Sequence, residues 1–316
     1  MKRRIACDWS TVRSYLALAI GVISIAWSAI FIRWIPMPGT ASAFYRVCLA
    51  TLALMPFLLF GRKRDMVCPT HCILLASVGG LFFAGDLSLF STAVQQTSIA
   101  NASVLANSSS VILAFISWFR TGRSPKPVLW LGLIATMMGS VLIVGTDFSK
   151  DLTFGRGDLL AMAAAVSFAA YLLVTERLRE RVDTTTVLGF SLVGSTVFLL
   201  SFNVVSGTSL QVPNGRTWLA LVGLALVSQL LGYFALTYAL SRFTALATSV
   251  TLLLQAALTS LLALALIGEP IGYFQMLGGL LVFFGVFIVN RQNQNKRRSE
   301  SGIICPTFAG WQQRNG

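Results

Sequence analysis

Long apolar runs alternate with short polar or Gly- and Pro-containing breaks along most of the chain. An α-helix needs about 20 apolar residues to cross a bilayer, and ten of these runs are close to that length. They predict spanning helices at residues 14–34, 40–60, 71–94, 98–119, 127–145, 157–177, 186–206, 217–240, 244–267 and 271–290. The pattern therefore predicts an all-α integral membrane protein.

The first run follows a basic segment, MKRRIACDWSTVR. It is longer than the apolar core of a signal peptide, which has about 7–15 residues. Pro36 and Pro38 come after it, where a signal peptide would have a cleavage site of small residues. We expect this run to be retained as the first spanning helix.

The composition agrees with a membrane protein. Hydrophobic residues make up 55% of the chain and charged residues only 11%, whereas a soluble domain has about 25% charged residues. The net charge of +13 would suggest a nucleic-acid partner in a soluble protein. Here the basic residues form short clusters between apolar runs, which is the pattern of membrane topology. The expected partner is therefore the lipid bilayer and not nucleic acid.

Lysine and arginine gather in the loops on the cytoplasmic side of membrane proteins. If the amino terminus is cytoplasmic, 19 of these residues lie inside and 4 outside, with Arg46 within the second helix. This distribution predicts that both termini are cytoplasmic.

The two halves of the chain repeat one another. WLGLIATMMGSVLI (130–143) and MLGGLLVFFGVFIV (276–289) share a pair of glycines seven residues apart, at an offset of 146 residues. Five helices make each half, and five is odd, so the second half must enter the membrane from the opposite side. We expect a cytoplasmic segment at 1–13, a first repeat at 14–145, an external linker at 146–156, a second repeat at 157–290 and a disordered cytoplasmic tail at 291–316.

Two motifs resemble a known family. FFAGDLSLFSTAVQQTSIANASVLANSSSVILAF (82–115) and LLLQAALTSLLALALIGEP (252–270) are similar to the EamA-type family of the drug/metabolite transporter superfamily. The resemblance covers residues 14–290, and Trp27 and Arg46 also fit it. The chain departs from the family where Ser110 and Ala256 replace common prolines. The details of gating depend on these two positions.

The resemblance implies ten helices in two inverted five-helix repeats around a central cavity. It implies alternating-access transport of a small metabolite, such as an amino acid, a nucleoside or a drug-like compound, across the bacterial cytoplasmic membrane. Export is the expected direction, and movement is either coupled to protons or uncoupled. The alternatives are a channel, a non-transporting membrane scaffold or an intramembrane enzyme. Neither the substrate nor the oligomeric state follows from the resemblance.

One carboxylate interrupts an apolar span. Asp86 lies in LFFAGDLSLF, although a charge at the centre of a bilayer costs about 2.5–3.5 kcal/mol. Arg46 lies at a similar predicted depth in the second helix, so the two could form a structural ion pair. Alternatively, Asp86 binds a substrate amine or a proton. Arg46 then tunes the pKa of Asp86 or holds an anionic group. The offset of 146 places Gly232 opposite Asp86, so the repeat itself requires no carboxylate there.

The other candidates are uncharged. Asn107 and Gln255 are favoured, because a buried amide has several hydrogen-bonding sites to satisfy. Serine and threonine in spanning helices usually serve packing. The remaining candidates for substrate binding or coupling are Asn101, Thr251, Trp27, Tyr171, Gln229 and Tyr233.

Cys68, His71 and Cys72 lie close together in the sequence but do not predict a metal site. Zinc sites usually need four ligands, and His71 is the single histidine of the chain. An enzyme would need a nucleophile with a base, or a metal, and the sequence offers little of either. We therefore predict no cofactor and no enzymatic activity.

Overall fold

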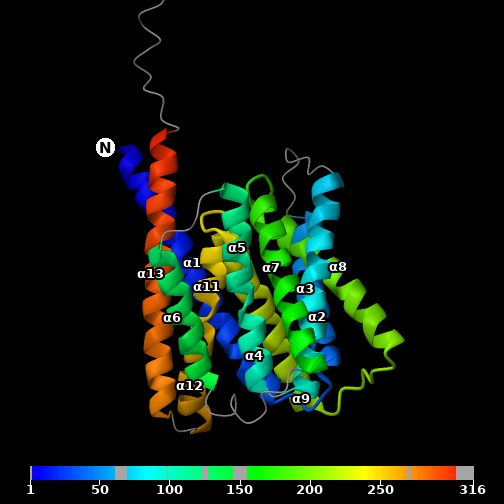
Figure 1. The fold of residues 1–316 in the computed structure, drawn as a ribbon. Coiled ribbons are helices and arrows are strands. Elements are labelled where there is room, and N and C mark those ends of the chain that lie inside the picture. The colour runs from blue at the N-terminus through cyan, green and yellow to red at the C-terminus, as the bar shows by residue number, and fades with distance from the viewer. Residues whose placement is uncertain are drawn as a thin grey trace, which may run out of the picture.

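The structure is a computed structural model that describes residues 2–60, 70–97, 99–122, 127–144, 155–268 and 272–303. This part of the chain is a helical bundle (Figure 1). Its elements are α1 (Lys2–Arg33), α2 (Gly39–Phe60), α3 (Thr70–Gln96), α4 (Ile99–Asn107), α5 (Ser109–Thr121), α6 (Pro127–Val144), α7 (Arg156–Arg179), α8 (Thr184–Val205), α9 (Gly215–Gly223), the π-helix η2 (Leu224–Gly232), α10 (Tyr233–Ala239), α11 (Ala245–Leu252), α12 (Leu254–Ile267) and α13 (Tyr273–Ile303).

The ten predicted spans are confirmed. Within the described ranges, nine segments are long and apolar enough to cross a membrane, and the shorter apolar helix Pro127–Ile143 makes the tenth. Helices α4 and α5 share the fourth span, α9, η2 and α10 share the eighth, and α11 and α12 share the ninth. Large apolar side chains such as Phe119, Leu131 and Phe283 are exposed on the outside of the bundle. A hydrocarbon layer would cover these side chains.

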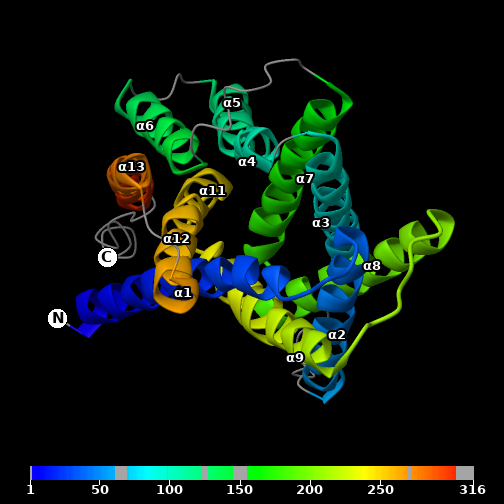
Figure 2. The ribbon, with the colours of Figure 1, turned by 90° about the horizontal axis from the view of Figure 1, so that it is seen from below.

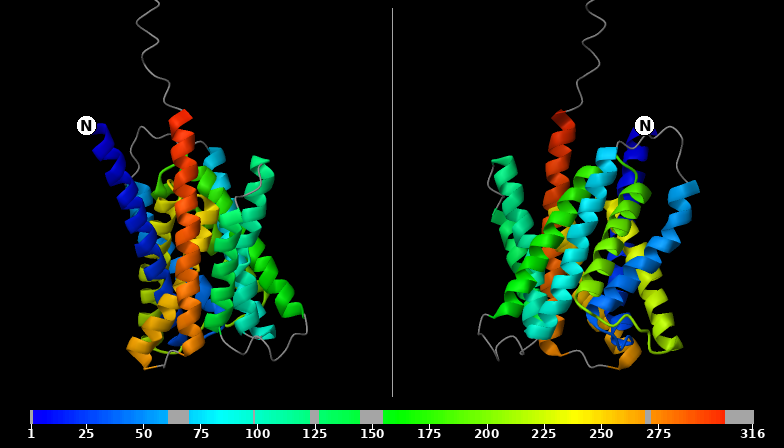
Figure 3. Two further views of the ribbon diagram at one scale, coloured as in Figure 1. Left: turned by 60° about the vertical axis from the view of Figure 1, so that its left-hand side comes forward. Right: turned by 90° about the vertical axis from the view of Figure 1, so that its right-hand side faces the viewer.

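The start of α1 and the end of α13 lie at the same end of the bundle (Figures 1 and 3). We call this end the terminal side, and the other end the opposite side. That the terminal side is cytoplasmic remains a prediction from the distribution of lysine and arginine.

The two repeats pack reciprocally. In the first half, α3 packs against α7 and α8, which are the first and second spans of the second half. In the second half, η2 packs against α1 and α2, which are the first and second spans of the first half. Exchanging the halves leaves this set of contacts unchanged, as expected for two inverted repeats.

The last spans of the two halves, α6 and α13, lie side by side (Figure 2). A Cβ on Gly139 would lie 2.6 Å from the carbonyl oxygen of Gly278, and a Cβ on Gly278 would lie 2.5 Å from that of Gly139. Gly132 and Gly285 meet in the same way, at 3.1 and 2.5 Å. Only glycine permits such an approach of two backbones. The glycine spacing that the two repeated segments share therefore reflects helix packing.

The fourth and ninth spans are each broken near their middle, although neither has a proline there. At Ser108, the backbone N–H donates to the carbonyl of Leu105 at 3.1 Å, and at Leu253 it donates to Val250 at 3.2 Å. These bonds span three residues instead of four, so a tight turn interrupts each helix. In the register of the repeat the two breaks lie within one residue of each other. The replacement of the family's prolines by Ser110 and Ala256 therefore leaves the discontinuity in place.

The end of the chain differs from the prediction. Helix α13 continues to Ile303, through residues predicted to belong to a disordered tail from 291. The segment QNQNKRRSES contains no glycine or proline, and most of its residues tolerate a helix. Residues 304–316 of the predicted tail and 146–154 of the predicted linker lie outside the described ranges.

The glycine contact between α6 and α13 can be tested with neighbouring residues. We expect Gly278→Ala to lower the free energy of unfolding by about 1–3 kcal/mol, because its Cβ would overlap the backbone of Gly139. Gly279→Ala is the matched control, since a Cβ there meets only Ala257 Cβ at 3.6 Å. Thermal unfolding in detergent measures both. Equal stability of the two variants would contradict this packing.

Candidate functional site

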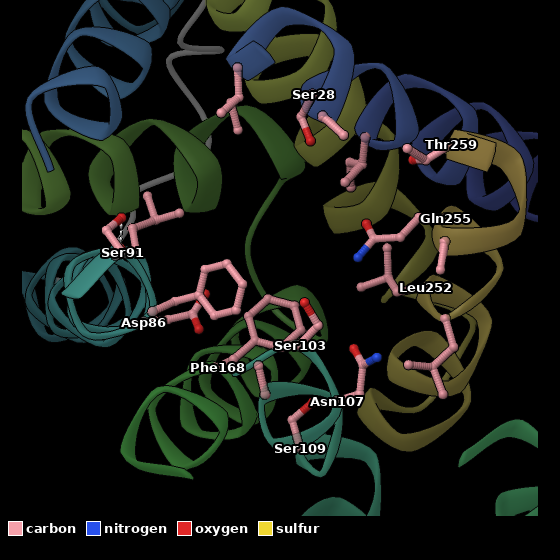
Figure 4. A pocket seen from close by; sticks show the side chains of 18 of the residues that line it. Ser28, Asp86, Ser91, Ser103, Asn107, Ser109, Phe168, Leu252, Gln255 and Thr259 are labelled. Atoms are coloured by element: carbon pink, nitrogen blue, oxygen red, sulfur yellow. Dashed lines mark hydrogen bonds between the residues drawn. The ribbon is translucent and has the colours of Figure 1, made fainter. Parts of the chain in front are cut away.

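A cavity of about 1100 Å³ lies between the two repeats (Figure 4). This volume is slightly above the range of about 300–1000 Å³ that is usual for small-molecule sites. Its lining comes from both halves of the chain and includes many hydroxyl and amide groups. The polar and charged lining residues are Ser28, Ser42, Arg46, Asp86, Ser91, Ser103, Asn107, Ser109, Ser140, Tyr233, Ser249, Gln255, Thr259 and Ser260.

The cavity extends toward the opposite side of the bundle. Its lining includes Ile32 near the end of α1, Gly39 at the start of α2 and Ile143 near the end of α6, all on that side. Toward the terminal side an aromatic cluster follows, in which the Phe83 ring lies 5.0 Å from Tyr171 and 4.8 Å from Tyr233, centroid to centroid. Apolar core residues continue beyond this cluster. The bundle is thus closed toward the terminal side.

Asp86 and Arg46 line the same cavity, from α3 and α2. They are close enough to interact electrostatically. However, Arg46 Nε donates to Gln229 Oε1 at 2.6 Å, and the guanidinium carbon lies 5.7 Å from the centre of the Tyr233 ring. Among the residues that the structure describes, none donates a hydrogen bond to the Asp86 carboxylate. The two charges are therefore neighbours without forming a direct ion pair.

Gln229 holds Arg46 from the π-helical segment η2. The side chain of Gln229 is completely buried, and its Nε2 has no partner among the described residues. The preceding Ser228 donates from Oγ to the carbonyl of Ser24 at 2.9 Å, which ties η2 to α1. Short π-helical segments occur frequently at functional sites, because the wider turn changes the direction in which side chains point.

Asn107 and Gln255 point into the cavity from α4 and α12 (Figure 4). Neither amide forms a hydrogen bond within the described part of the chain, so both are available to a ligand. One turn beyond Gln255, Thr259 also lines the cavity, and its hydroxyl donates to the carbonyl of Ala26 at 3.0 Å.

Five predicted site residues thus line the cavity, namely Asp86, Arg46, Asn107, Gln255 and Tyr233. Gln229 contacts it through Arg46, and the buried Tyr171 lies behind it against Phe83. Two others are not among the lining residues. Thr251 donates to the carbonyl of Ala247 at 2.6 Å and accepts from Asn290 at 2.9 Å, and Trp27 packs against Phe31. The side chain of Asn101 lies outside the described residues.

Sequence reasoning missed two aromatic lining residues, Phe90 and Phe168. Phenylalanine is so common in spanning helices that nothing in the sequence separates a cavity residue from a lipid-facing one. Phe90 had one usable signal, since it follows Asp86 by four residues and so lies on the same face of α3.

A family model described as the EamA-like transporter family matches residues 12–145 and 155–291. The chain belongs to the EamA-like transporter family. The two matches fall on the two halves of the chain, in agreement with the two-repeat architecture.

Several relatives are described as uncharacterized transporters. One from Archaeoglobus fulgidus is 27% identical over 89% of this chain and 99% of its own length. YwfM of Bacillus subtilis is 27% identical over 67% of this chain and 72% of its own length. A solved structure titled "Crystal structure of protein" has a TM-score of 0.72 and 19% identity, and covers 90% of this chain and 98% of that one. That likeness shows a shared fold, and the family and its relatives show that this EamA-like protein is a membrane transporter.

The contact between Arg46 and Gln229 predicts a stability difference. Gln229→Leu removes the acceptor of a buried guanidinium and should lower the free energy of unfolding by about 1.5–3 kcal/mol. Gln255→Leu is the matched control, because that amide faces the cavity and has no described partner. Chemical denaturation in detergent compares the two. A larger loss for Gln255→Leu would contradict the role assigned to Gln229.

Proposed function

We propose that this EamA-like protein is a secondary transporter that moves a small metabolite by alternating access. The observation that supports this best is the cavity between the two repeats, which is lined by Asp86 and Arg46, reaches toward the opposite side and has buried aromatic and apolar side chains on its terminal side. Charged groups inside a spanning bundle typically mark a substrate or ion pathway. In inverted-repeat transporters, one bundle rocks against the other around such a site.

The source of energy is inferred from the sequence. The chain has no phosphate-binding loop ending in Gly-Lys-Ser or Gly-Lys-Thr, so nothing suggests ATP as the driving force. Asp86 can hold a proton or a positively charged substrate group, and competition between the two for this carboxylate would couple substrate movement to a proton gradient. Uncoupled movement is the simpler alternative.

Access from the terminal side would require contacts between α7 and α10 to separate. Arg179, at the end of α7, donates from Nε to the carbonyl of Thr237 in α10 at 3.0 Å, and from Nη1 to the carbonyl of Val182. The buried hydroxyls of Thr175, in α7, and Thr237, in α10, lie close to the side chain of Tyr171.

The membrane orientation completes the proposal. With both termini in the cytoplasm of a bacterium, the opposite side faces outward, and the structure corresponds to an outward-facing state. Such a state receives substrate for uptake and releases it in export. We propose export, which is the direction that the resemblance to the EamA-type family implies.

Counterflow in liposomes tests the role of Asp86. The purified protein would be reconstituted and assayed with a panel of labelled amino acids, nucleosides and organic amines. Wild type should show saturable exchange of at least one compound, and Asp86→Asn should reduce it about tenfold or more, because a charged hydrogen bond is worth about 1.5–3 kcal/mol.

Asp158→Asn is the control for the loss of a carboxylate. Asp158 is buried near the start of α7, where it accepts hydrogen bonds from Gly155 and Thr97 and takes no part in the cavity. Unchanged exchange by Asp86→Asn would show that Asp86 serves packing. Non-saturable flux by wild type would favour a channel.

Cysteine labelling tests the closure on the terminal side. In a variant whose native cysteines are replaced by serine, Thr237→Cys should react slowly with a membrane-impermeant maleimide, because Thr237 is buried. Adding Arg179→Gln should accelerate labelling about tenfold, since it removes a hydrogen bond that favours the closed state. Adding Arg177→Gln, at an exposed position two residues earlier and on another face of α7, should have no effect. Equal rates in all three backgrounds would contradict the proposed opening.

A further inference from the structure

The cavity presents its two charges unequally. Arg46 is only 6% exposed, its Nε donates to Gln229, and its guanidinium carbon lies 5.7 Å from the centre of the Tyr233 ring. Asp86 is half-buried, lines the cavity, and has no hydrogen bond or ion pair with any residue that the structure describes. A ligand entering the cavity therefore meets a carboxylate without a hydrogen-bonding partner, whereas the positive charge is more deeply buried and already donates to Gln229.

Aromatic side chains line the cavity on the side of this carboxylate. Phe90 follows Asp86 by one helical turn on α3, and Phe168 reaches the cavity from α7. Figure 4 shows the ring of Phe168 beside Asp86, directed into the cavity. The faces of aromatic rings attract a cation and repel an anion, with an attraction of about 0.5–2 kcal/mol per ring. A carboxylate flanked by such rings favours an ammonium group bound to an apolar or aromatic body.

The remaining wall fits the uncharged part of such a molecule. Asn107 and Gln255 extend into the cavity from α4 and α12, and neither amide has a hydrogen-bonding partner among the residues that the structure describes. They can hydrogen-bond a hydroxyl, an ether or a ring nitrogen. A volume of about 1100 Å³ accommodates a body as large as a two-ring compound.

We propose that the cavity binds monovalent organic ammonium ions in preference to anions, zwitterions and neutral compounds of the same shape. An added carboxylate on the ligand would need Arg46, which is more deeply buried than Asp86 and already donates to Gln229, and it would lie close to Asp86. A zwitterion should therefore bind more weakly than the corresponding amine. The proposal names the substrate class of the transporter proposed above and rests on that function.

Four compounds that share an indole ring system but differ in charge can separate the effect of charge on binding from the effect of shape. Equilibrium binding to the purified full-length protein in detergent would be measured for tryptamine, tryptophol, indole-3-propionate and tryptophan. Tryptamine should bind at least about tenfold more tightly than each of the others, which corresponds to about 1.4 kcal/mol. Asp86→Asn should remove this preference, whereas Asp86→Glu, which keeps the charge, and Asp158→Asn should retain it.

Each contrary result overturns the proposal. Equal or tighter binding of indole-3-propionate or tryptophan would show that Arg46 recognises the ligand. Absence of tryptamine binding at millimolar concentration, or a preference that survives Asp86→Asn in a monodisperse protein, would also reject it.

Counterflow of the same compounds in liposomes separates this inference from the proposed function. Selective tryptamine binding without counterflow would reject transport while leaving the selectivity in place. Saturable counterflow of the acid or the zwitterion, without that of the amine, would leave transport in place and reject the selectivity.

Discussion

Close contact between backbones of opposite repeats is the interaction on which this bundle depends. In a bilayer, apolar side chains gain nothing by leaving lipid for another helix, so association relies on close packing and on hydrogen bonds between helices. Glycines provide the close packing between α6 and α13. Between α8 and α3, Ser191 donates to the carbonyl of Ala76 at 2.9 Å and Ser195 to that of Gly80 at 2.7 Å. The cavity occupies the region between the repeats where such contacts end.

The sequence was informative where a single physical requirement governs a long segment. The thickness of the bilayer fixes the length of an apolar helix, so ten spans could be predicted to within a few residues. The repeated glycines indicated two equivalent halves, and the structure shows that they allow the backbones of α6 and α13 to approach closely. Asp86 could be singled out for a similar reason, since a carboxylate in a spanning helix is too costly to be incidental.

The details of the site were harder to predict, because they depend on contacts between distant residues. Arg46 and Gln229 are 183 positions apart, and their hydrogen bond depends on a π-helical segment that has no sequence signature. An ion pair between Arg46 and Asp86 was the simpler expectation, and the structure gives Arg46 another partner. The helix breaks at Ser108 and Leu253 were also hidden, since the prolines that usually announce them are missing.

The presence of one acid and one base in the cavity also has an electrical consequence. Asp86 and Arg46 cancel each other, so an empty carrier would bring no net charge into the membrane field. A carrier loaded with a monovalent cation would bring one positive charge, and moving it across the full potential involves about 2.3 kcal/mol per 100 mV. The second repeat offers only Gly232 at the position of Asp86 and adds no further charge. Transport of a cation by this bundle would thus be sensitive to voltage, whereas the return of the empty bundle would not.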